Sequence, residues 1–237
     1  MQKKRKSKLD INTEDMIKAG VHLGHQTSKL HPKMEKFVLG IRNTVHVIDL
    51  EKSAEYLKKA LEAIEEISKE GKDILIVGTK IPLRETVREI AENSKIPCVT
   101  ERWLGGTFTN SKNIFKRVQY YKDLKEKKAK GELDKYTKKE RIKIEEELEK
   151  LEKKFGGIKD MEELPEAVFI CDLKKDNLAM REAKIKKVKV FAICDTNVDP
   201  TGVDYPIPAN DDALSSVRYI LERVALAAGK SKIKSVK

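Results

Sequence analysis

The chain has 237 residues, of which 39% are hydrophobic, 38% are charged and only 5% are aromatic. It contains no apolar run close to the roughly 18 residues that cross a bilayer, so we expect a soluble protein without a membrane partner. Its length suits one α/β domain with an appendage. The basic start M-Q-K-K-R-K has no apolar segment behind it, which argues against a secretory signal and favours a cytoplasmic protein.

The positive charge is concentrated at the two ends of the chain. The formal net charge is +11, and the nine cations of the predicted tails at 1–8 and 229–237 leave +2 for residues 9–228. The tail cations are Lys3, Lys4, Arg5, Lys6, Lys8, Lys230, Lys232, Lys234 and Lys237. Basic arms suit contact with a phosphate backbone, so we predict that they bind RNA, with a solubilising role as the alternative. Residues 9–228 are predicted to form one domain.

Helix and strand signals alternate along this domain. A capping pair at 12–13 predicts a short helix that ends at Gly20. Residues 45–49 predict a strand, and apolar residues at helical spacing over 54–67 predict a helix that stops at Gly71. Further strands are expected at 74–77, 96–100, 167–171 and 188–194, and further helices after Pro82, over 177–186 and over 212–228. Because the strands are apolar enough to be buried on both faces, the pattern predicts a three-layer α/β/α fold around a parallel sheet.

The segment at 112–155 breaks this alternation. It holds sixteen Lys or Arg against ten Asp or Glu and gives no strand signal. Apolar residues recur along it at helical spacing: Ile114, Val118, Tyr121 and Leu124, then Ile144, Leu148, Leu151 and Phe155. Two such series are typical of helices paired as an antiparallel coiled coil, here turning near 131–136 and projecting from the body as a docking arm. A solvated hairpin without a partner is the alternative.

Polar residues follow several predicted strands, which makes an enzyme worth considering. Ligands of open α/β sheets bind beyond the carboxyl ends of the strands. In this chain the polar residues at those positions are 78–80, Thr100, Asp172, 195–197 and 210–212. However, the sequence contains neither of the glycine-rich phosphate-binding motifs nor a G-x-S-x-G nucleophile motif. We therefore predict no catalytic residue, no cofactor and no small-molecule substrate, and we expect Thr79 and Asp211 to cap the helices that follow them.

Three of the four histidines lie close together, at His22, His25 and His31. A metal site is disfavoured because no cysteine and few acids accompany them, and because H-L-G-H is interpreted as a turn around Gly24 rather than a helical zinc-binding pair. Imidazoles can stack on bases while cations hold the phosphates, which favours RNA. The predicted RNA-binding residues of this segment are His22, His25, Lys29, His31, Lys33, Lys36 and Arg42.

The single tryptophan stands in the run E-R-W-L-G-G-T-F-T-N at 101–110. A large ring beside two glycines needs a fixed backbone path, so it either plugs the core or anchors a junction. Since the run lies between a predicted strand and the hairpin, we expect it to set the exit of the hairpin, with Asn110 or Ser111 capping the first hairpin helix. The predicted junction residues are Trp103, Gly105 and Gly106. The predicted RNA-binding residues here are Arg102, Asn110 and Lys112.

Seven motifs occur in order along the chain. They are H-L-G-H-Q-T at 22–27, H-P-K-M at 31–34, I-R-N-T-V-H-V-I-D-L-E-K-S at 41–53, I-V-G-T-K at 76–80, E-R-W-L-G-G-T-F-T-N at 101–110, C-D-T-N-V-D-P at 194–200 and D-Y-P-I-P-A-N-D-D-A at 204–213. Together they resemble the bacterial-type ribosomal protein S2 family of the small subunit, in register from about Met16 to Ala228. The segment at 112–155 is similar to the coiled-coil hairpin of the bacterial members. The chain departs from the usual family residues at Thr44, 107–108 and Ala209.

The resemblance implies a flavodoxin-like parallel sheet with a protruding hairpin, bound to small-subunit ribosomal RNA. It also implies neighbouring small-subunit proteins as partners, among them ribosomal protein S1, which the family helps to anchor. We therefore expect a non-catalytic, structural constituent of the small ribosomal subunit that supports subunit assembly and translation. The alternatives are an α/β enzyme that acts on a phosphorylated small molecule and an accessory RNA-binding factor that only visits the ribosome.

Overall fold

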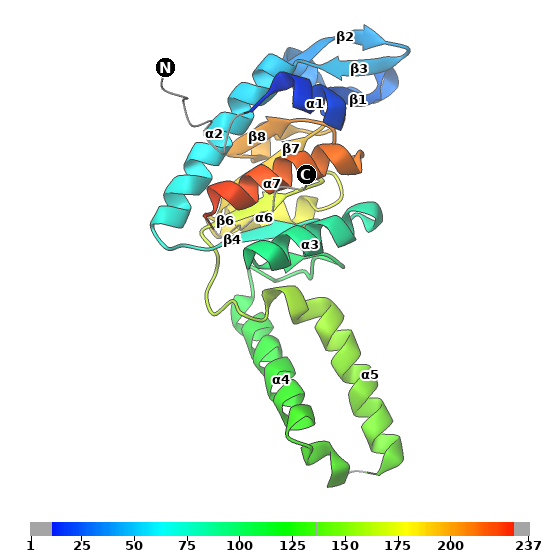
Figure 1. Cartoon of the computed structure of the whole chain (residues 1–237), viewed down its shortest axis with the longest axis vertical. Helices are drawn as coiled ribbons and strands as arrows, with labels where there is room; N and C mark the ends of the chain where they lie inside the picture. Colours follow the sequence, from blue (N-terminus) through cyan, green and yellow to red (C-terminus); the bar gives the residue numbers. More distant parts are fainter. Residues whose placement is uncertain (1–10, 136, 230–237) are drawn as a thin grey trace, which may run out of the picture.

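The computed structural model describes residues 11–135 and 137–229. The cations of both predicted tails lie outside the described residues, so the structure does not test their role. The described chain forms a layered α/β body and a helical hairpin that projects from one end of it (Figure 1). No helix within the described ranges is long and apolar enough to cross a membrane.

A five-stranded parallel sheet forms the centre of the body, in the order β5-β4-β6-β7-β8. Its strands are β4 (Ile74–Val77), β5 (Cys98–Val99), β6 (Ala167–Ile170), β7 (Lys189–Cys194) and β8 (Tyr205–Pro208). Every residue of β4 and β6 is buried, because both faces of these central strands are covered. Strand β8 was not predicted. Its P-I-P sequence lacks two backbone N–H groups, and prolines of this kind are tolerated at the edge position that β8 occupies.

Four helices share a core with one face of this sheet: α1 (Thr13–Ala19), α2 (Leu50–Lys69), α3 (Arg84–Ser94) and α7 (Leu214–Ala227). The predicted start of α1 is confirmed, since the side chain of Asn12 accepts a hydrogen bond from the N–H of Glu14 at 3.0 Å. Leu57 of α2 and Ile220 of α7 are fully buried against sheet residues such as Phe169. The apolar spacing over 54–67 therefore identified the buried face of α2 correctly.

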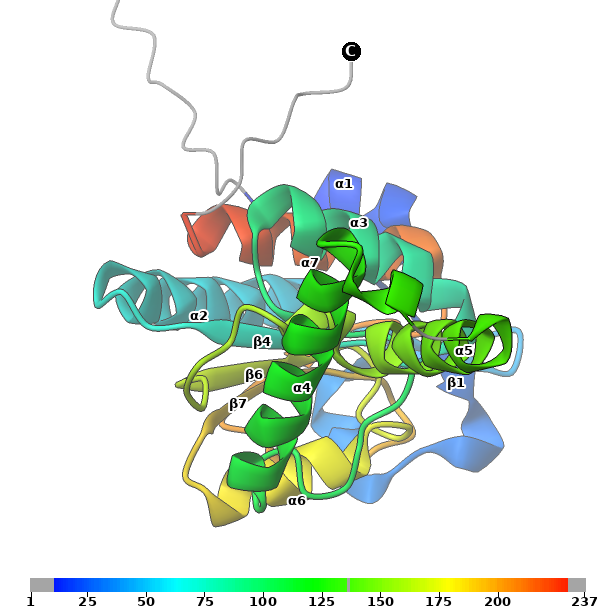
Figure 2. The ribbon, with the colours of Figure 1, turned by 90° about the horizontal axis from the view of Figure 1, so that it is seen from below.

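The opposite face of the sheet is covered by α6 (Asn177–Ile185) and by the base of the hairpin. Their shared core joins Leu75 and Val190 of the sheet to Trp103, Phe108 and Ala179. Figure 2 shows α6 and α7 on opposite sides of the strands. The predicted flavodoxin-like, three-layer α/β/α fold is therefore confirmed.

A second sheet was largely missed. Strands β1 (Leu23–Gln26), β2 (Val38–Arg42) and β3 (Val45–Ile48) form a small antiparallel sheet in the order β1-β3-β2. The sequence predicted β3, but the interpretation of H-L-G-H as a turn was wrong, because Gly24 lies inside β1. The alternation of apolar and polar residues is weak in β1 and β2, whose residues are mostly exposed, so their pairing with β3 decides their conformation.

The projecting hairpin consists of α4 (Ser111–Ala129) and α5 (Lys138–Phe155). The two helices are antiparallel, with Lys125 bound to Glu152 at 2.9 Å and Lys128 to Glu145 at 3.2 Å. Three predicted apolar residues on each helix are buried: Val118, Tyr121, Leu124, Leu148, Leu151 and Phe155. That this seam packs as a coiled coil stays a prediction.

Short 3-10 turns complete the fold: η1 (Thr27–Lys29), η2 (Pro32–Phe37), η3 (Ile81–Leu83), η4 (Glu132–Lys135), η5 (Gly156–Ile158) and η6 (Pro200–Gly202).

Candidate functional site

The cations predicted for the N-terminal segment lie on the surface around β1, η2 and β2. Lys29, Lys33, Lys36 and Arg42 are all exposed. Lys33 is held in place, since its Nζ lies 2.9 Å from Oδ2 of Asp199 and 2.7 Å from Oγ1 of Thr201. The Nζ of Lys36 stands 4.9 Å from the centre of the Phe37 ring. This segment therefore presents a positively charged surface, part of which is fixed by η6.

The histidines of the segment are only partly exposed, and two of them have bonds within the protein. His31 caps η2, since its Nδ1 accepts a hydrogen bond from the N–H of Lys33 at 3.4 Å. His25 lies between two carboxylates, with Nδ1 3.2 Å from Asp195 and Nε2 3.3 Å from Asp212. Burial and the charge of Arg42 lower the pKa of His22, which favours its neutral ring. Stacking of these rings on bases stays a prediction.

The other predicted RNA-binding residues form a separate group at the base of the hairpin. Arg102, Asn110 and Lys112 are exposed there. They follow β5, whereas the first group belongs to the N-terminal strands and turns (Figure 1). The structure therefore divides the predicted set into two surfaces, and any RNA that touches both must pass along the body between them.

A partly buried polar cluster lies at the carboxyl ends of the parallel strands, which is where the ligand of an α/β enzyme would bind. Lys80 after β4 is its centre, with Nζ 3.0 Å from Asp172, 3.2 Å from Asp211 and 2.6 Å from Asp212. His25 reaches the same place from β1. Its strand can approach because position 24 is glycine: a Cβ there would stand 2.6 Å from Cγ2 of Thr196.

The cluster shifts the pKa values of its members. The hydrogen bond from His25 to Asp195 raises the pKa of the imidazole, against the opposing effect of burial. Burial raises the pKa of Asp211 to about 7, and the neighbouring Asp172 and Asp195 add to the effect while Lys80 opposes it. Burial disfavours the Lys80 ammonium, but the surrounding carboxylates outweigh it and raise the pKa of Lys80. Lys80 therefore stays charged and offsets part of the negative charge of this cluster.

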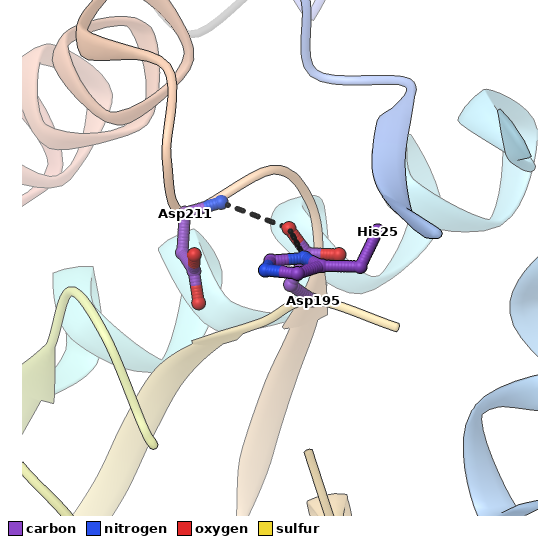
Figure 3. A group of neighbouring side chains, drawn as sticks. All are labelled: His25, Asp195 and Asp211. Carbon is purple, nitrogen blue, oxygen red and sulfur yellow. Dashed lines mark hydrogen bonds and ion pairs between the residues drawn. The ribbon is translucent and has the colours of Figure 1, made fainter. Parts of the chain in front are cut away.

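Three members of the cluster have the arrangement of metal ligands. A ring nitrogen of His25 and carboxylate oxygens of Asp195 and Asp211 lie within 4.8 Å of one another (Figure 3). Nitrogen and carboxylate ligands of this kind could hold a divalent cation such as Zn²⁺. The two acids were predicted to follow strands, but nothing in the sequence connected them to His25, which is 170 residues from Asp195. The N–H of His25 donates to Oγ1 of Thr196 at 2.9 Å, and the N–H of His31 donates to the Thr196 carbonyl at 2.8 Å, so contacts with Thr196 hold β1 at this end of the parallel sheet.

The expectation that Thr79 and Asp211 cap helices is wrong. The hydroxyl of Thr79 donates to Asp176 at 2.7 Å, and α3 begins without a side-chain cap. Helix α7 also begins without a side-chain cap, because its N-cap position is Ala213. In the turn before it, the side-chain oxygen of Asn210 accepts hydrogen bonds from the N–H groups of Asp212 and Ala213 at 2.7 and 3.0 Å, and Asp211 binds Lys80 instead.

The run at 101–110 is organised by a residue that the sequence analysis missed. The buried carboxylate of Glu182, on α6, accepts hydrogen bonds from the indole N–H of Trp103 at 3.3 Å and from the N–H of Gly106 at 2.7 Å. It also accepts from the N–H groups of Phe108 and Thr109 at 3.0 and 3.2 Å. Burial opposes ionisation, yet these donors together lower the pKa of Glu182. No local signal marks Glu182, because its partners are more than 70 residues away.

The structure places the predicted junction residues directly before α4. The Trp103 ring is 6% exposed and packs edge-on against Phe108, with ring centres 4.9 Å apart. Gly106 has φ +92°, a conformation that favours glycine, whereas Gly105 has an ordinary φ. Asn110 occupies the N-cap position of α4 but makes no side-chain capping bond. The turn is therefore held from α6 rather than by a local cap.

Comparisons with known proteins agree with the motif resemblance. The family model described as Ribosomal protein S2 matches residues 16–231. The small ribosomal subunit protein uS2 of Coprothermobacter proteolyticus is 43% identical over 215 residues, covering 91% of this chain and 80% of the relative. The protein of that name from Fusobacterium nucleatum is 44% identical over 218 residues, covering 92% of this chain and 88% of the relative. The chain therefore belongs to the Ribosomal protein S2 family.

Proposed function

We propose that this chain is a structural constituent of the small ribosomal subunit that binds ribosomal RNA and supports subunit assembly and translation. The observation that carries the proposal is family membership over nearly the whole chain. Proteins of this family are structural rather than enzymatic, and they work in the ribosome, in the cytoplasm. The exposed cations of the N-terminal segment and of the hairpin base support an RNA-binding role, since phosphate contacts are made mainly by such side chains.

The polar cluster at the strand ends gives little support to an enzyme. Its buried acids are bound to Lys80 and His25, so they already have partners within the protein. Thr79, the hydroxyl closest to Lys80 in the sequence, is bound to Asp176. This arrangement stabilises the carboxyl edge of the sheet, and it is compatible with a structural protein.

Sedimentation of ribosomes tests the proposed function. The expected result is stoichiometric co-sedimentation with small subunits that persists after a salt wash. Free protein would favour the enzyme, and association lost in the wash would favour an accessory factor. Binding of the free protein to small-subunit ribosomal RNA should weaken with salt, with a log-log slope of roughly −0.7 to −0.9 for each phosphate neutralised. Deletion of residues 1–8 and 230–237 should weaken this binding without unfolding the body.

Ribosomal protein S1 is proposed as one neighbour, and the hairpin as an arm that contacts RNA or a protein of the subunit. The family resemblance supports the first part, and the exposed, charged helices of the hairpin support the second. Small subunits that lack this chain should retain less S1 than complete ones. Unchanged S1 in such particles would contradict the anchoring role.

A further inference from the structure

A positively charged cavity of about 530 Å³ lies between α6 and η6. Its cations are Lys33, Lys174, Arg181 and Lys184. Among the described residues that line it, Asp199 is the single carboxylate, and it is bound to Lys33. The Thr201 hydroxyl and Lys33 also lower the pKa of Asp199, so it stays ionised beside that lysine. The other three cations have no carboxylate in the lining, which leaves the cavity with an excess of positive charge.

The cations on one wall come from a single face of α6. Asn177, Arg181 and Lys184 follow one another at spacings of four and three residues, so they share a face of the helix, and Lys174 precedes it in the adjoining turn. Lys174, Arg181 and Lys184 are all exposed. The acid of this helix, Glu182, is turned away into the hairpin base. The helix therefore separates its charges, with cations toward the cavity and the carboxylate toward the junction.

The side chain of Lys184 reaches across to η6. A Cβ built on Gly202 would stand 3.2 Å from the Nζ of Lys184 and 2.7 Å from the sulfur of Met180. The amine therefore lies over the backbone of η6, on the side where Lys33 binds Asp199 and Thr201. Positive charge thus faces the cavity from both of its walls.

A second cavity, of about 690 Å³, continues this surface toward the N-terminal segment. It shares Lys33 and Thr201 with the first cavity and adds Lys36, the carboxylate of Glu35 and Tyr56. An aromatic ring next to spaced cations is typical of surfaces that follow a nucleic-acid strand, where rings stack on bases and cations hold phosphates. The cations are exposed and spread over two adjoining cavities, which suits a strand better than one small enclosed anion.

We propose that the cavity lined by Lys33, Lys174, Arg181 and Lys184 binds the phosphodiester backbone of RNA. This inference rests on the proposed RNA-binding function. It adds cations on and next to α6 to the RNA-binding residues that were predicted from the sequence. Lys33 belongs both to this cavity and to the RNA-binding residues predicted in the N-terminal segment. At its other end, α6 contacts the hairpin base through Glu182. The cavity therefore lies between the two predicted RNA-binding surfaces.

The test is a pair of double variants of the full chain. Lys174→Gln with Lys184→Gln removes two cations from the cavity, and Lys18→Gln with Lys58→Gln removes two exposed lysines from α1 and α2 as a matched control. Binding to transcribed small-subunit ribosomal RNA is measured over a range of salt concentrations, and unfolding by urea checks that both variants are folded. The cavity variant should bind more weakly, and its log-log salt slope should be smaller in magnitude by about 1.4 to 1.8.

The outcomes separate this inference from the proposed function. If the wild-type chain fails to bind the RNA, the proposed function is wrong. If the wild type binds and the cavity variant keeps the slope of the control, only the cavity assignment is wrong. Adenosine monophosphate provides the last comparison: tight binding of this free nucleotide, lost in the cavity variant, would show a small-molecule phosphate site and overturn the RNA assignment.

Discussion

Replacing Glu182 by glutamine tests whether a single carboxylate on α6 holds the base of the hairpin. One oxygen accepts from the N–H groups of Trp103 and Gly106, and the other accepts from those of Phe108 and Thr109. Glutamine keeps the size of the side chain but offers only one acceptor oxygen. Whichever way its amide is turned, its NH₂ faces two N–H donors that then lose their partner.

The expected cost follows from these two donors. A buried donor left without a partner costs about 1 to 3 kcal/mol, and the lost charge also weakens the bonds that remain. We therefore expect Glu182→Gln to lower the free energy of unfolding by about 2 to 6 kcal/mol. That is a large part of the roughly 5 to 15 kcal/mol by which domains are stable.

Urea unfolding and hydrogen exchange measure this effect. Glu62→Gln, at an exposed position of α2, is the matched control and should change stability by less than about 0.5 kcal/mol. Exchange of the amides at 106–109 should accelerate in Glu182→Gln. Because the folded pKa of Glu182 is lowered, its contribution is present above pH 4.5 and is lost as the pH falls below that ordinary value. A loss of stability no larger than that of the control would refute the argument.

Three further predictions concern the polar cluster and the junction. The pKa of Asp211 is about 7 in the folded protein, against an ordinary value of 3.8. Asp211 therefore contributes to the stability of the folded state at low pH, and this contribution is lost as the pH rises between those two values. Asp211→Asn should therefore be more stable than wild type at pH 8, by at most about 4 kcal/mol, when both are unfolded in urea with a chelator present. Lys80→Met leaves buried carboxylates without their cation and should cost about 3 to 5 kcal/mol at pH 7; an unchanged urea midpoint would contradict the role of Lys80. Trp103→Ala should cost about 3 to 5 kcal/mol and accelerate exchange in the first turns of α4 more than in α7, and equal protection in both helices would count against its anchoring role.

Most regular elements of the body could be predicted because their signals are local. The apolar run of β4 and the apolar spacing of α2 depend only on which neighbouring residues must be buried together. Strands β1, β2 and β8 escaped prediction for the opposite reason. Strands β1 and β2 are mostly exposed and β8 contains two prolines, so each is a strand because another strand pairs with it.

The sequence by itself determined the order of the elements, the excess of positive charge and, through motifs in register, the family. Only the tertiary structure decided which side chains meet. The carboxylate of Glu182 binds a turn more than 70 residues away, His25 joins Asp195 across 170 residues, and Lys33 and Lys184 line the same cavity. Such contacts form because strand pairing and helix packing bring elements together that are distant in the sequence. No spacing along the sequence records them.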